Sequence, residues 1–373
     1  MLARSLAIAL LLSLAACGGG SGGSSASGGR IGHVFIIVLE NEDFGNSFAP
    51  DSAAPYLAKT LPAQGALLQN YYGIGHVSLD NYIAMISGQG PNLITQSDCQ
   101  IYQDFVDLPT PLANGQYSGV GCVYPATVPS LPDQLRAANI SWRAYMEDMG
   151  STPAREAATC GHPALNSRDG TQSPTADDQY ATRHNPFMYF HSVIDDPAYC
   201  DEHVVNFDQL AADLAQDKLP RFVFITPNLC HDGHDAPCQN GEPGGLLSIN
   251  DFLSTWVPRL TASSAFQDGL LIVTFDESGG PQSDSSACCA GFPSPNTPLP
   301  GIAGPGGGIV GAVVLSPFVK PGTVSTIDYN HYSLLRTVED LFGLPALGFA
   351  GATGSVHFGS DVFTAQPPDF PGS

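Results

Sequence analysis

Two apolar runs, each ending in acidic or amide residues, decide the fold and point to a site. The first run is His33–Leu39 (HVFIIVL), followed by Glu40-Asn41, and the second is 270–275 (LLIVTF), followed by Asp276-Glu277. Short runs rich in β-branched and aromatic residues predict buried strands of a parallel sheet. Ligands of open α/β sheets bind beyond the carboxyl ends of the strands, so we expect both polar pairs to meet at one sheet edge.

The convergence of these four residues predicts a metal centre. Glu40, Asp276 and Glu277 are carboxylates and Asn41 is an amide. Three carboxylates brought together repel one another unless a cation lies between them, and oxygen ligands suit a divalent cation. We therefore expect one divalent metal cation, of unspecified identity, and a metal-assisted enzyme.

Strand-like and helix-like segments alternate along most of the chain. This order predicts a three-layer α/β/α sandwich with a largely parallel central sheet and helices on both faces. Asn206 with Gln209, and Ser248 with Asp251, have the spacing of capping boxes at helix starts. Four long loops, at about 90–128, 150–200, 228–246 and 278–308, are of the length that is usually functional or disulfide-tied. The expected strands are 33–39, 141–146, 221–226, 270–275 and 310–315, and the expected helices are 79–87, 130–138, 206–216, 248–260 and 331–342.

Composition excludes some classes of protein. The 373 residues are 43% hydrophobic and 13% charged, which allows a sizeable core and argues against global disorder. The formal net charge is −22, from 35 Asp and Glu against 13 Lys and Arg. Such a surface disfavours nucleic acid and anionic lipid as partners. A phosphate-bearing substrate is still compatible, because a bound cation can invert the local field.

The N-terminus has the pattern of a targeting segment. Arg4 and the apolar run 6–14 fit a signal peptide that is too short to span a bilayer. It ends in Leu14-Ala15-Ala16-Cys17, which resembles the bacterial lipobox. We expect a lipoprotein signal peptide at 1–16, a Gly/Ser-rich tether at 17–30 and a single domain at 31–373. The resemblance implies a lipid anchor on Cys17 at the periplasmic or cell-surface side of a bacterial membrane; ordinary secretion is the alternative.

Eight cysteines remain when Cys17 is set aside, and in an exported protein an even number favours disulfides. Cys99–Cys122 and Cys230–Cys238 are plausible local pairs. The adjacent Cys288-Cys289 could bridge each other or pair elsewhere, since the sequence does not fix connectivity. A zinc–thiolate site is disfavoured because the C-x₂-C spacing is absent.

Ser78 stands where a helix is expected to begin. The simple interpretation is an N-cap, the usual role of a serine at such a position. The functional interpretation is a nucleophile: the helix N-terminus attracts an incoming anion, and a neighbouring metal lowers the pKa of the hydroxyl. Together with the two acidic strand ends, the second interpretation gains support.

At this point the chain resembles a known family. Five ordered motifs look like those of the phosphoesterase family of acid phosphatases and bacterial phospholipases C, within the alkaline-phosphatase-like superfamily. The resemblance extends from His33 to Leu344. The motifs are Glu40-Asn41, 75–82 (GHVSLDNY), 226–235 (TPN…DGHD), 274–280 (TFDESGG) and 331–340 (HYSLLRTVED).

The resemblance implies roles for individual residues. Ser78 would be the nucleophile that forms a phosphoserine, and its Oγ would join Glu40, Asn41, Asp276 and Glu277 around the metal. Histidines and an asparagine would bind phosphate oxygens or protonate the leaving group: His234 and His331 as catalytic residues, and His76, Asn81 and His231 as substrate-binding residues. We expect only one of His231 and His234 to contact substrate, with Asp232 or Asp235 orienting a histidine. His33 is expected to be structural, and His162, His184, His191 and His203 receive no role.

The chain also departs from the family. Glu42 stands where many relatives carry an arginine, and the stretch 280–284 lacks an aromatic and a histidine found in many relatives. A phosphate contact is therefore missing or supplied by another loop. The expected activity is a metal-dependent, acid-phosphatase-like hydrolysis of phosphate esters. A phospholipase C-type phosphodiesterase is the alternative, with a phospholipid head group as substrate. A sulfatase is disfavoured because the Cys-x-Pro-x-Arg motif is absent from this sequence. A metal-binding protein without catalysis is a further alternative.

Overall fold

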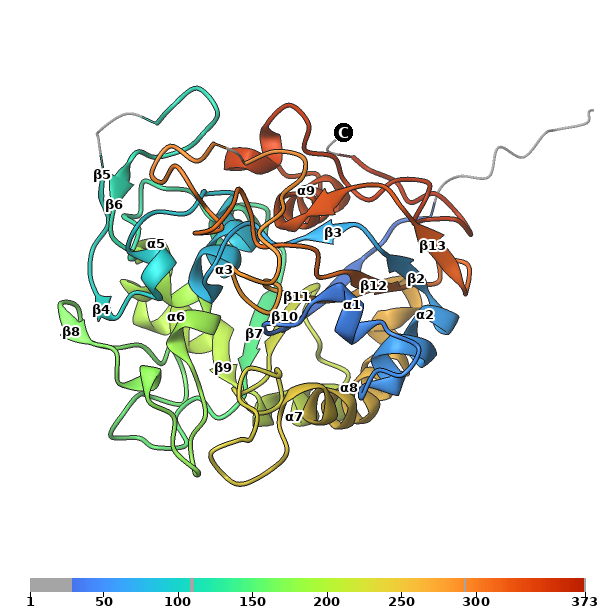
Figure 1. Cartoon of the computed structure of the whole chain (residues 1–373), viewed down its shortest axis with the longest axis horizontal. Helices are drawn as coiled ribbons and strands as arrows, with labels where there is room; N and C mark the ends of the chain where they lie inside the picture. The colour runs from blue at the N-terminus through green and yellow to red at the C-terminus, as the bar shows by residue number, and fades with distance from the viewer. Residues whose placement is uncertain (1–28, 108–110, 292, 372–373) are drawn as a thin grey trace, which may run out of the picture.

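The computed structural model describes residues 29–107, 111–291 and 293–371. Its centre is an eight-stranded sheet with the order β13-β2-β12-β11-β1-β10-β7-β9 (Figure 1). The strands of this sheet are β1 (His33–Leu39), β2 (Ala66–Leu68), β7 (Trp142–Met146), β9 (Val204–Asn206), β10 (Phe222–Thr226), β11 (Gly269–Phe275), β12 (Ala312–Leu315) and β13 (Thr323–Ser325). Short pairs outside it are β3 (Tyr71–Tyr72) with β14 (Tyr329–Asn330), β4 (Ile101–Tyr102) with β8 (Ser167–Arg168), and β5 (Val106–Asp107) with β6 (Gly119–Val120).

The sheet is largely parallel. β1 lies between β10 and β11 and pairs with both in parallel, and β7 and β9 continue in the same direction. β12 is antiparallel to both of its neighbours, so β2 and β13 again run with the majority. The buried, β-branched strands β1, β10 and β11 occupy the middle, as their continuous apolar sequences predict.

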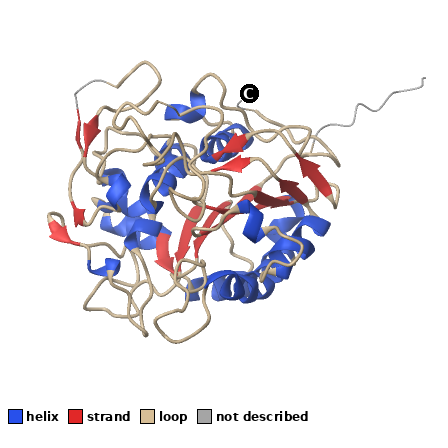
Figure 2. Ribbon diagram, viewed as in Figure 1, coloured by secondary structure: helices blue, strands red, loops and turns tan. Residues whose placement is uncertain are grey.

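Helices cover both faces of the sheet (Figure 2). α3 and α9 pack together on one side, and α7 and α8 lie on the other (Figure 1). The predicted three-layer α/β/α fold is therefore confirmed. The α-helices are α1 (Phe44–Ser47), α2 (Leu61–Gln64), α3 (Ser78–Ser87), α4 (Leu131–Ala137), α5 (His191–Ile194), α6 (Pro197–His203), α7 (Asp208–Ala215), α8 (Gly245–Thr261) and α9 (His331–Phe342).

Most predicted elements lie within two or three residues of the observed ones, but the two capping boxes are wrong. α7 follows Phe207 rather than Asn206, and α8 starts three residues before Ser248, whose Oγ accepts from the Gly244 N–H at 3.1 Å. The observed box is at α4, where Asp133 accepts from the Ser130 N–H at 2.8 Å. The three-residue strands β2, β9 and β13 were not predicted, because runs this short carry little periodicity.

Four disulfides tie the loops. The two predicted local pairs, Cys99–Cys122 and Cys230–Cys238, are confirmed. Cys288 and Cys289 bridge each other, and the fourth pair is Cys160–Cys200. The predicted signal peptide, Cys17 and most of the tether lie outside the described residues. Within the described ranges, no helix combines the length and apolar character needed to cross a membrane.

Candidate active site

The ends of the two central strands bring Glu40 and Asp276 together. β1 and β11 pair in register up to Leu39 and Phe275, so each acid is the next residue of its strand. The Asp276 N–H donates to the Leu39 carbonyl at 2.9 Å, and the Asn41 N–H donates to Asp276 Oδ1 at 3.1 Å. Both carboxylates are fully buried. The register of the parallel pair therefore creates the expected acidic edge.

Ser78 lies against this edge. It is the first residue of α3, and its Oγ donates to Glu40 Oε2 at 2.7 Å. Val77 occupies the N-cap position, so Ser78 is not the N-cap of this helix. Tyr82, one helical turn further on, donates through its hydroxyl to Glu40 Oε1 at 2.6 Å. The helix thus presents a hydroxyl to the carboxylate cluster at its own N-terminus, where backbone N–H groups favour an anion.

A histidine to which the sequence gave no role completes the cluster. His184 belongs to the short 3₁₀ helix Thr182–His184 in the long loop 150–200. Its Nδ1 lies 3.1 Å from Asp232 Oδ2 and its Nε2 lies 3.4 Å from Glu40 Oε1. The ring stacks on Tyr82, with an interplanar angle of 7°. No spacing in the sequence relates His184 to the strand ends, because only the folded loop brings it there.

Burial dominates the electrostatics of the cluster. Burial raises the pKa of Glu40 well above its usual range, and the neighbouring charges of Asp276 and Asp232 raise it further. Burial likewise raises the pKa of Asp232, and it raises that of Asp276 to about 7. Burial lowers the pKa of His184, which favours the neutral imidazole that binds metals. These groups need either protons or a shared cation to be stable together.

The donor set fits a divalent cation. Glu40, His184 and Asp232 offer ligand atoms that all lie within 4.8 Å of one another. Among the described residues, Asp276 Oδ2 and His184 Nε2 are buried without a hydrogen-bond partner. The Asp232–His184 pair has the arrangement in which a carboxylate fixes the tautomer of a metal-binding imidazole. A bound metal would satisfy these unpartnered buried ligand atoms.

The other two expected ligands are placed differently. The Glu277 carboxylate contacts His76 Nδ1, so that it is paired with a buried histidine. Asn41 has a positive φ of 54°, a conformation that asparagine tolerates better than most residues, and its backbone rather than its side chain contacts Asp276. The structure thus brings Glu40, Asp276 and Ser78 together, and gives Asn41 and Glu277 contacts at the border of the cluster.

The two histidines of loop 228–246 have different surroundings. His234 is hydrogen-bonded through Nδ1 to Asp235 at 2.8 Å, and its ring lies 5.8 Å from that of His184. The charge of His234 also lowers the pKa of Asp276, although burial outweighs it. His231 instead pairs with Glu147 at 2.9 Å and approaches Glu242. His234 is therefore the histidine of this loop that borders the cluster.

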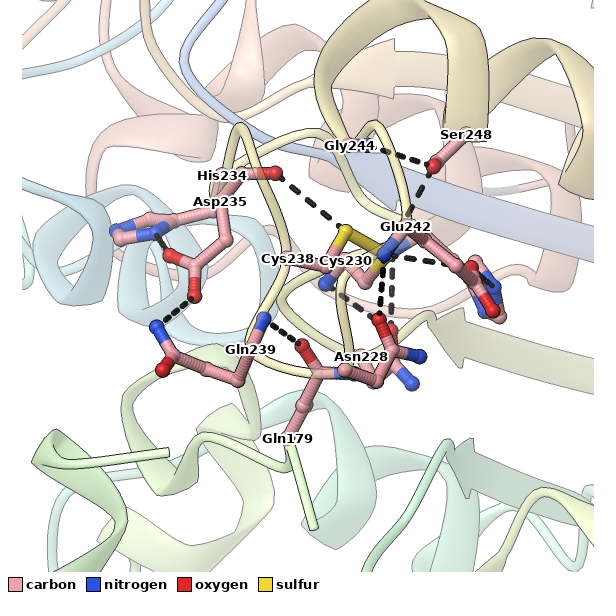
Figure 3. The surroundings of a disulfide bond; sticks show 12 residues. Gln179, Asn228, Cys230, His234, Asp235, Cys238, Gln239, Glu242, Gly244 and Ser248 are labelled. Atoms are coloured by element: carbon pink, nitrogen blue, oxygen red, sulfur yellow. Dashed lines mark hydrogen bonds and ion pairs between the residues drawn. A yellow bond between two sulfur atoms is a disulfide. The ribbon is translucent and has the colours of Figure 1, made fainter. Parts of the chain in front are cut away.

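A disulfide fixes the shape of this loop (Figure 3). Cys230–Cys238 closes the segment that carries Asp232, His234 and Asp235. Figure 3 shows Asn228 on one side of the bridge, where its side-chain Oδ1 accepts from the Cys230 N–H at 3.0 Å. The predicted orienting role of Asp235 has a geometric basis here, because it contacts His234 directly.

The remaining predicted residues are buried in internal contacts. The Asn81 amide accepts from the Ile74 N–H and donates to the Gly75 and Val77 carbonyls, which shapes the turn before Ser78. His76 Nε2 contacts the Asp284 carbonyl at 3.0 Å. His331 uses both ring nitrogens, one on the Asp276 carbonyl and one on the Tyr71 hydroxyl. Burial lowers the pKa of His331 to about 4. In this structure these side chains hold the site's backbone in place.

The fold and the site define the class: an α/β protein in which a buried serine at a helix N-terminus lies beside a cluster of metal-ligand type. The sequence profile of the Phosphoesterase family matches residues 46–345, and the chain belongs to this family.

Relatives and solved structures agree with this placement. The chain is 30% identical over 328 residues to the phosphate-repressible acid phosphatase of Penicillium chrysogenum, covering 88% of this chain and 63% of that protein. It is 24% identical over 318 residues to the phosphatidylinositol-3-phosphatase of Mycobacterium tuberculosis, covering 85% and 79%. It spans 58% to 63% of the length of the fungal acid phosphatases that it matches. A solved Bacteroides thetaiotaomicron structure, titled for glycosaminoglycan metabolism, shares the fold at a TM-score of 0.50 and 10% identity, covering 91% and 83%.

Proposed function

We propose that this protein is a metal-dependent, acid-phosphatase-like hydrolase of phosphate monoesters that works through a phosphoserine. The contact that carries the proposal is the hydrogen bond from Ser78 Oγ to Glu40 Oε2 at the N-terminus of α3. It brings the serine hydroxyl to a cluster of metal-ligand type at a helix end that attracts anions, which supports a role for Ser78 as nucleophile. Similarity to the acid phosphatases supports the reaction class.

A divalent cation would be held by Glu40, Asp276, His184 and Ser78, with Asp232 fixing the His184 ring. Bound there, it would supply Lewis-acid neutralisation of phosphate charge and a lowered pKa for the serine hydroxyl. This ligand set keeps three of the five residues that the family resemblance implies and adds His184. Asn41 and Glu277 would support it from the border.

The protein's own groups account for the remaining steps. The Ser78 hydroxyl passes its proton to Glu40 Oε2, which accepts its hydrogen bond, and Oγ forms a bond to phosphorus as the ester P–O bond breaks in line with the attack. His234 donates a proton to the departing alkoxide from Nε2 when substrate is bound and Nε2 has released the hydrogen bond that it accepts from Arg183 in this structure, while Asp235 holds Nδ1. Water then cleaves the phosphoserine, releases phosphate and restores the serine hydroxyl. The first-turn N–H groups of α3 would stabilise the negative charge of the transferred group.

The test is a comparison of two esters under metal control. Initial rates on an aryl phosphomonoester and an aryl phosphodiester are measured before chelation, after chelation and after metal add-back. Faster monoester hydrolysis that disappears with the metal and returns with it supports the proposal. Faster diester hydrolysis would assign the protein to the phospholipase C-type alternative. Turnover of neither ester by a folded, metal-loaded sample would reject a general phosphatase.

The cellular location is supported at a coarse level. Four disulfides are expected in an oxidising compartment rather than in the cytosol. The finer proposal is a lipid anchor at Cys17. Growth with labelled fatty acid tests it: the label should enter the protein and be lost in Cys17→Ser, whereas an unlabelled wild type would favour ordinary secretion.

A further inference from the structure

Arg183 is a buried cation whose hydrogen-bonding capacity is largely unused. It is 5% exposed and immediately precedes His184 in the same 3₁₀ helix. Its Nη2 lies 3.2 Å from His234 Nε2, and its Nε lies 3.6 Å from Asp98 Oδ2. Among the described residues, its Nε and Nη1 have no hydrogen-bond partner. Buried guanidinium donors are normally satisfied. Nε at least faces the Asp98 carboxylate, whereas Nη1 indicates an acceptor that the folded chain does not itself provide.

A short chain of contacts ties Arg183 to the nucleophile. Asp98 Oδ1 accepts from the Leu79 N–H at 3.1 Å, and Leu79 directly follows Ser78 in α3. The other oxygen of the same carboxylate is the one that approaches Arg183. On the opposite side, Arg183 contacts His234, which we place at the leaving group. The guanidinium therefore stands between the helix N-terminus that carries Ser78 and the proton donor.

The charge of Arg183 affects the pKa values of several groups in the site. It lowers the pKa values of Asp98 and Asp232, although in both cases burial raises them by more. It also lowers the pKa of His184, in addition to the larger effect of burial. Without this charge, the carboxylates Glu40, Asp232 and Asp276 would repel an anionic substrate. Arg183 provides a fixed positive charge with a planar fork that matches two oxygens of a phosphoryl group.

We propose that Arg183 binds the non-bridging oxygens of the phosphoryl group and makes the site select dianionic monoesters over monoanionic diesters. The inference rests on the proposed function and deepens it. A monoester dianion offers three terminal oxygens and two charges, whereas a diester offers two oxygens and one charge. A fixed guanidinium therefore gains more from the monoester. It also supplies, from loop 150–200, the phosphate contact absent from 280–284.

The experiment compares two arginine variants on two esters. Arg183→Met removes the buried charge and retains an unbranched side chain of similar length. Arg259→Met is the matched control, because Arg259 lies exposed on α8 and stacks on Trp256. For Arg183→Met we expect kcat/KM for an aryl phosphomonoester to fall about 100-fold, and for an aryl phosphodiester less than about tenfold. Arg259→Met should leave both values unchanged. Equal losses on both esters, or no loss, would overturn the proposal.

Phosphate binding separates this inference from the proposed function. Inorganic phosphate should bind the metal-loaded wild type and bind Arg183→Met at least about tenfold more weakly. If wild type turned over neither ester but showed this difference, the proposed function would fail and the role of Arg183 would stand. If wild type hydrolysed the monoester and the variant matched it in rate and phosphate affinity, the role of Arg183 would fail alone. A wild type that binds no phosphate also rejects the role.

A second variant keeps the test informative if Arg183→Met does not fold. Arg183→Lys keeps the charge but loses the fork, and should retain phosphate binding better than Arg183→Met while losing part of the monoester preference. Near-ultraviolet circular dichroism establishes whether each variant is folded. If only the lysine variant folds, an unchanged monoester-to-diester ratio in that variant would reject the selective role of Arg183.

Discussion

The candidate site has two sides that are built in different ways. On one side, Glu40 and Asp276 extend from β1 and β11, whose register places them next to each other. On the other side, Arg183 and His184 come from a 3₁₀ turn in a long loop. Asp232 and His234 lie in a second loop, closed by the Cys230–Cys238 bridge. The strand side is fixed by the regular backbone ladder between β1 and β11. The loop side depends on irregular contacts: single backbone hydrogen bonds, such as that from the Glu40 N–H to the Asp232 carbonyl at 2.8 Å, together with side-chain contacts and a disulfide.

The comparison assigns different proposed roles, chemistry and substrate selectivity, to the two sides of the site. In our proposal the strand side and α3 supply the nucleophile and most of the metal ligands. The loop side supplies the charge and the proton that meet the substrate. Loops tolerate sequence change better than the strands that they connect. Substitutions on the two sides should therefore have different consequences, and the following predictions test that division.

The largest effect is expected at the nucleophile. Ser78→Ala should lower kcat on an aryl phosphomonoester by roughly 10⁴-fold or more, because no other group replaces the attacking oxygen. Ser87→Ala is the matched control: this buried serine at the other end of α3 donates to the Ile83 carbonyl and accepts from the Gln89 N–H, outside the cluster, and activity should persist. Unfolding transitions of both variants should remain cooperative. Residual activity of Ser78→Ala within tenfold of wild type would remove the serine from the mechanism.

A smaller effect is expected on metal affinity. One variant on each side of the site allows the two sides to be compared directly. Asp276→Asn should weaken the affinity for the metal at least about 100-fold, and His184→Gln about tenfold, as measured by titration of the chelated protein. Asp268→Asn makes the same chemical change at the opposite end of β11, where Asp268 pairs with His33, and should bind metal normally. Wild-type affinity in His184→Gln would confine the metal to the strand side.

The smallest effect concerns stability and contrasts the two loop histidines. Burial by itself would lower the pKa of His231, but the contact with Glu147 and the charges of Glu242 and Asp148 outweigh it and raise that pKa. The charged form therefore contributes stability that is fully present below about pH 6.5 and is lost as pH rises through the raised pKa. His231→Gln should lower Tm more at pH 5.5 than at pH 9, with little change in kcat. A large loss of kcat would instead place His231 at the substrate.

The sequence allowed a good prediction of the strand side. Continuous apolar runs predicted β1 and β11 almost to the residue, and their polar ends predicted Glu40 and Asp276. The helix that starts at Ser78 was predicted within one residue. These features are local, since each depends on a few consecutive residues and on the rule that ligands bind at the carboxyl ends of strands.

The loop side could not be predicted in the same way. His184 and Arg183 lie in a segment without periodicity, and nothing in their spacing relates them to Glu40. His231 and His234 are three residues apart and look equivalent in sequence, yet one faces Glu147 and the other Asp235 and the cluster. The roles of Asn81 and His331 come from the family resemblance and stay predictions; the structure adds that both side chains are buried and hydrogen-bonded to backbone groups.

The sequence by itself determined the α/β class, the acidic sheet edge, the position of Ser78 and two of the disulfides, because these follow from local patterns and short separations. Only the tertiary structure decided which histidine joins the cluster, where the Glu277 carboxylate points, and that a buried arginine approaches the N-terminus of α3 through Asp98. The physical reason is that burial and pairing depend on which distant segments pack together. In this protein, loop 150–200 packs over the sheet edge that the strands create.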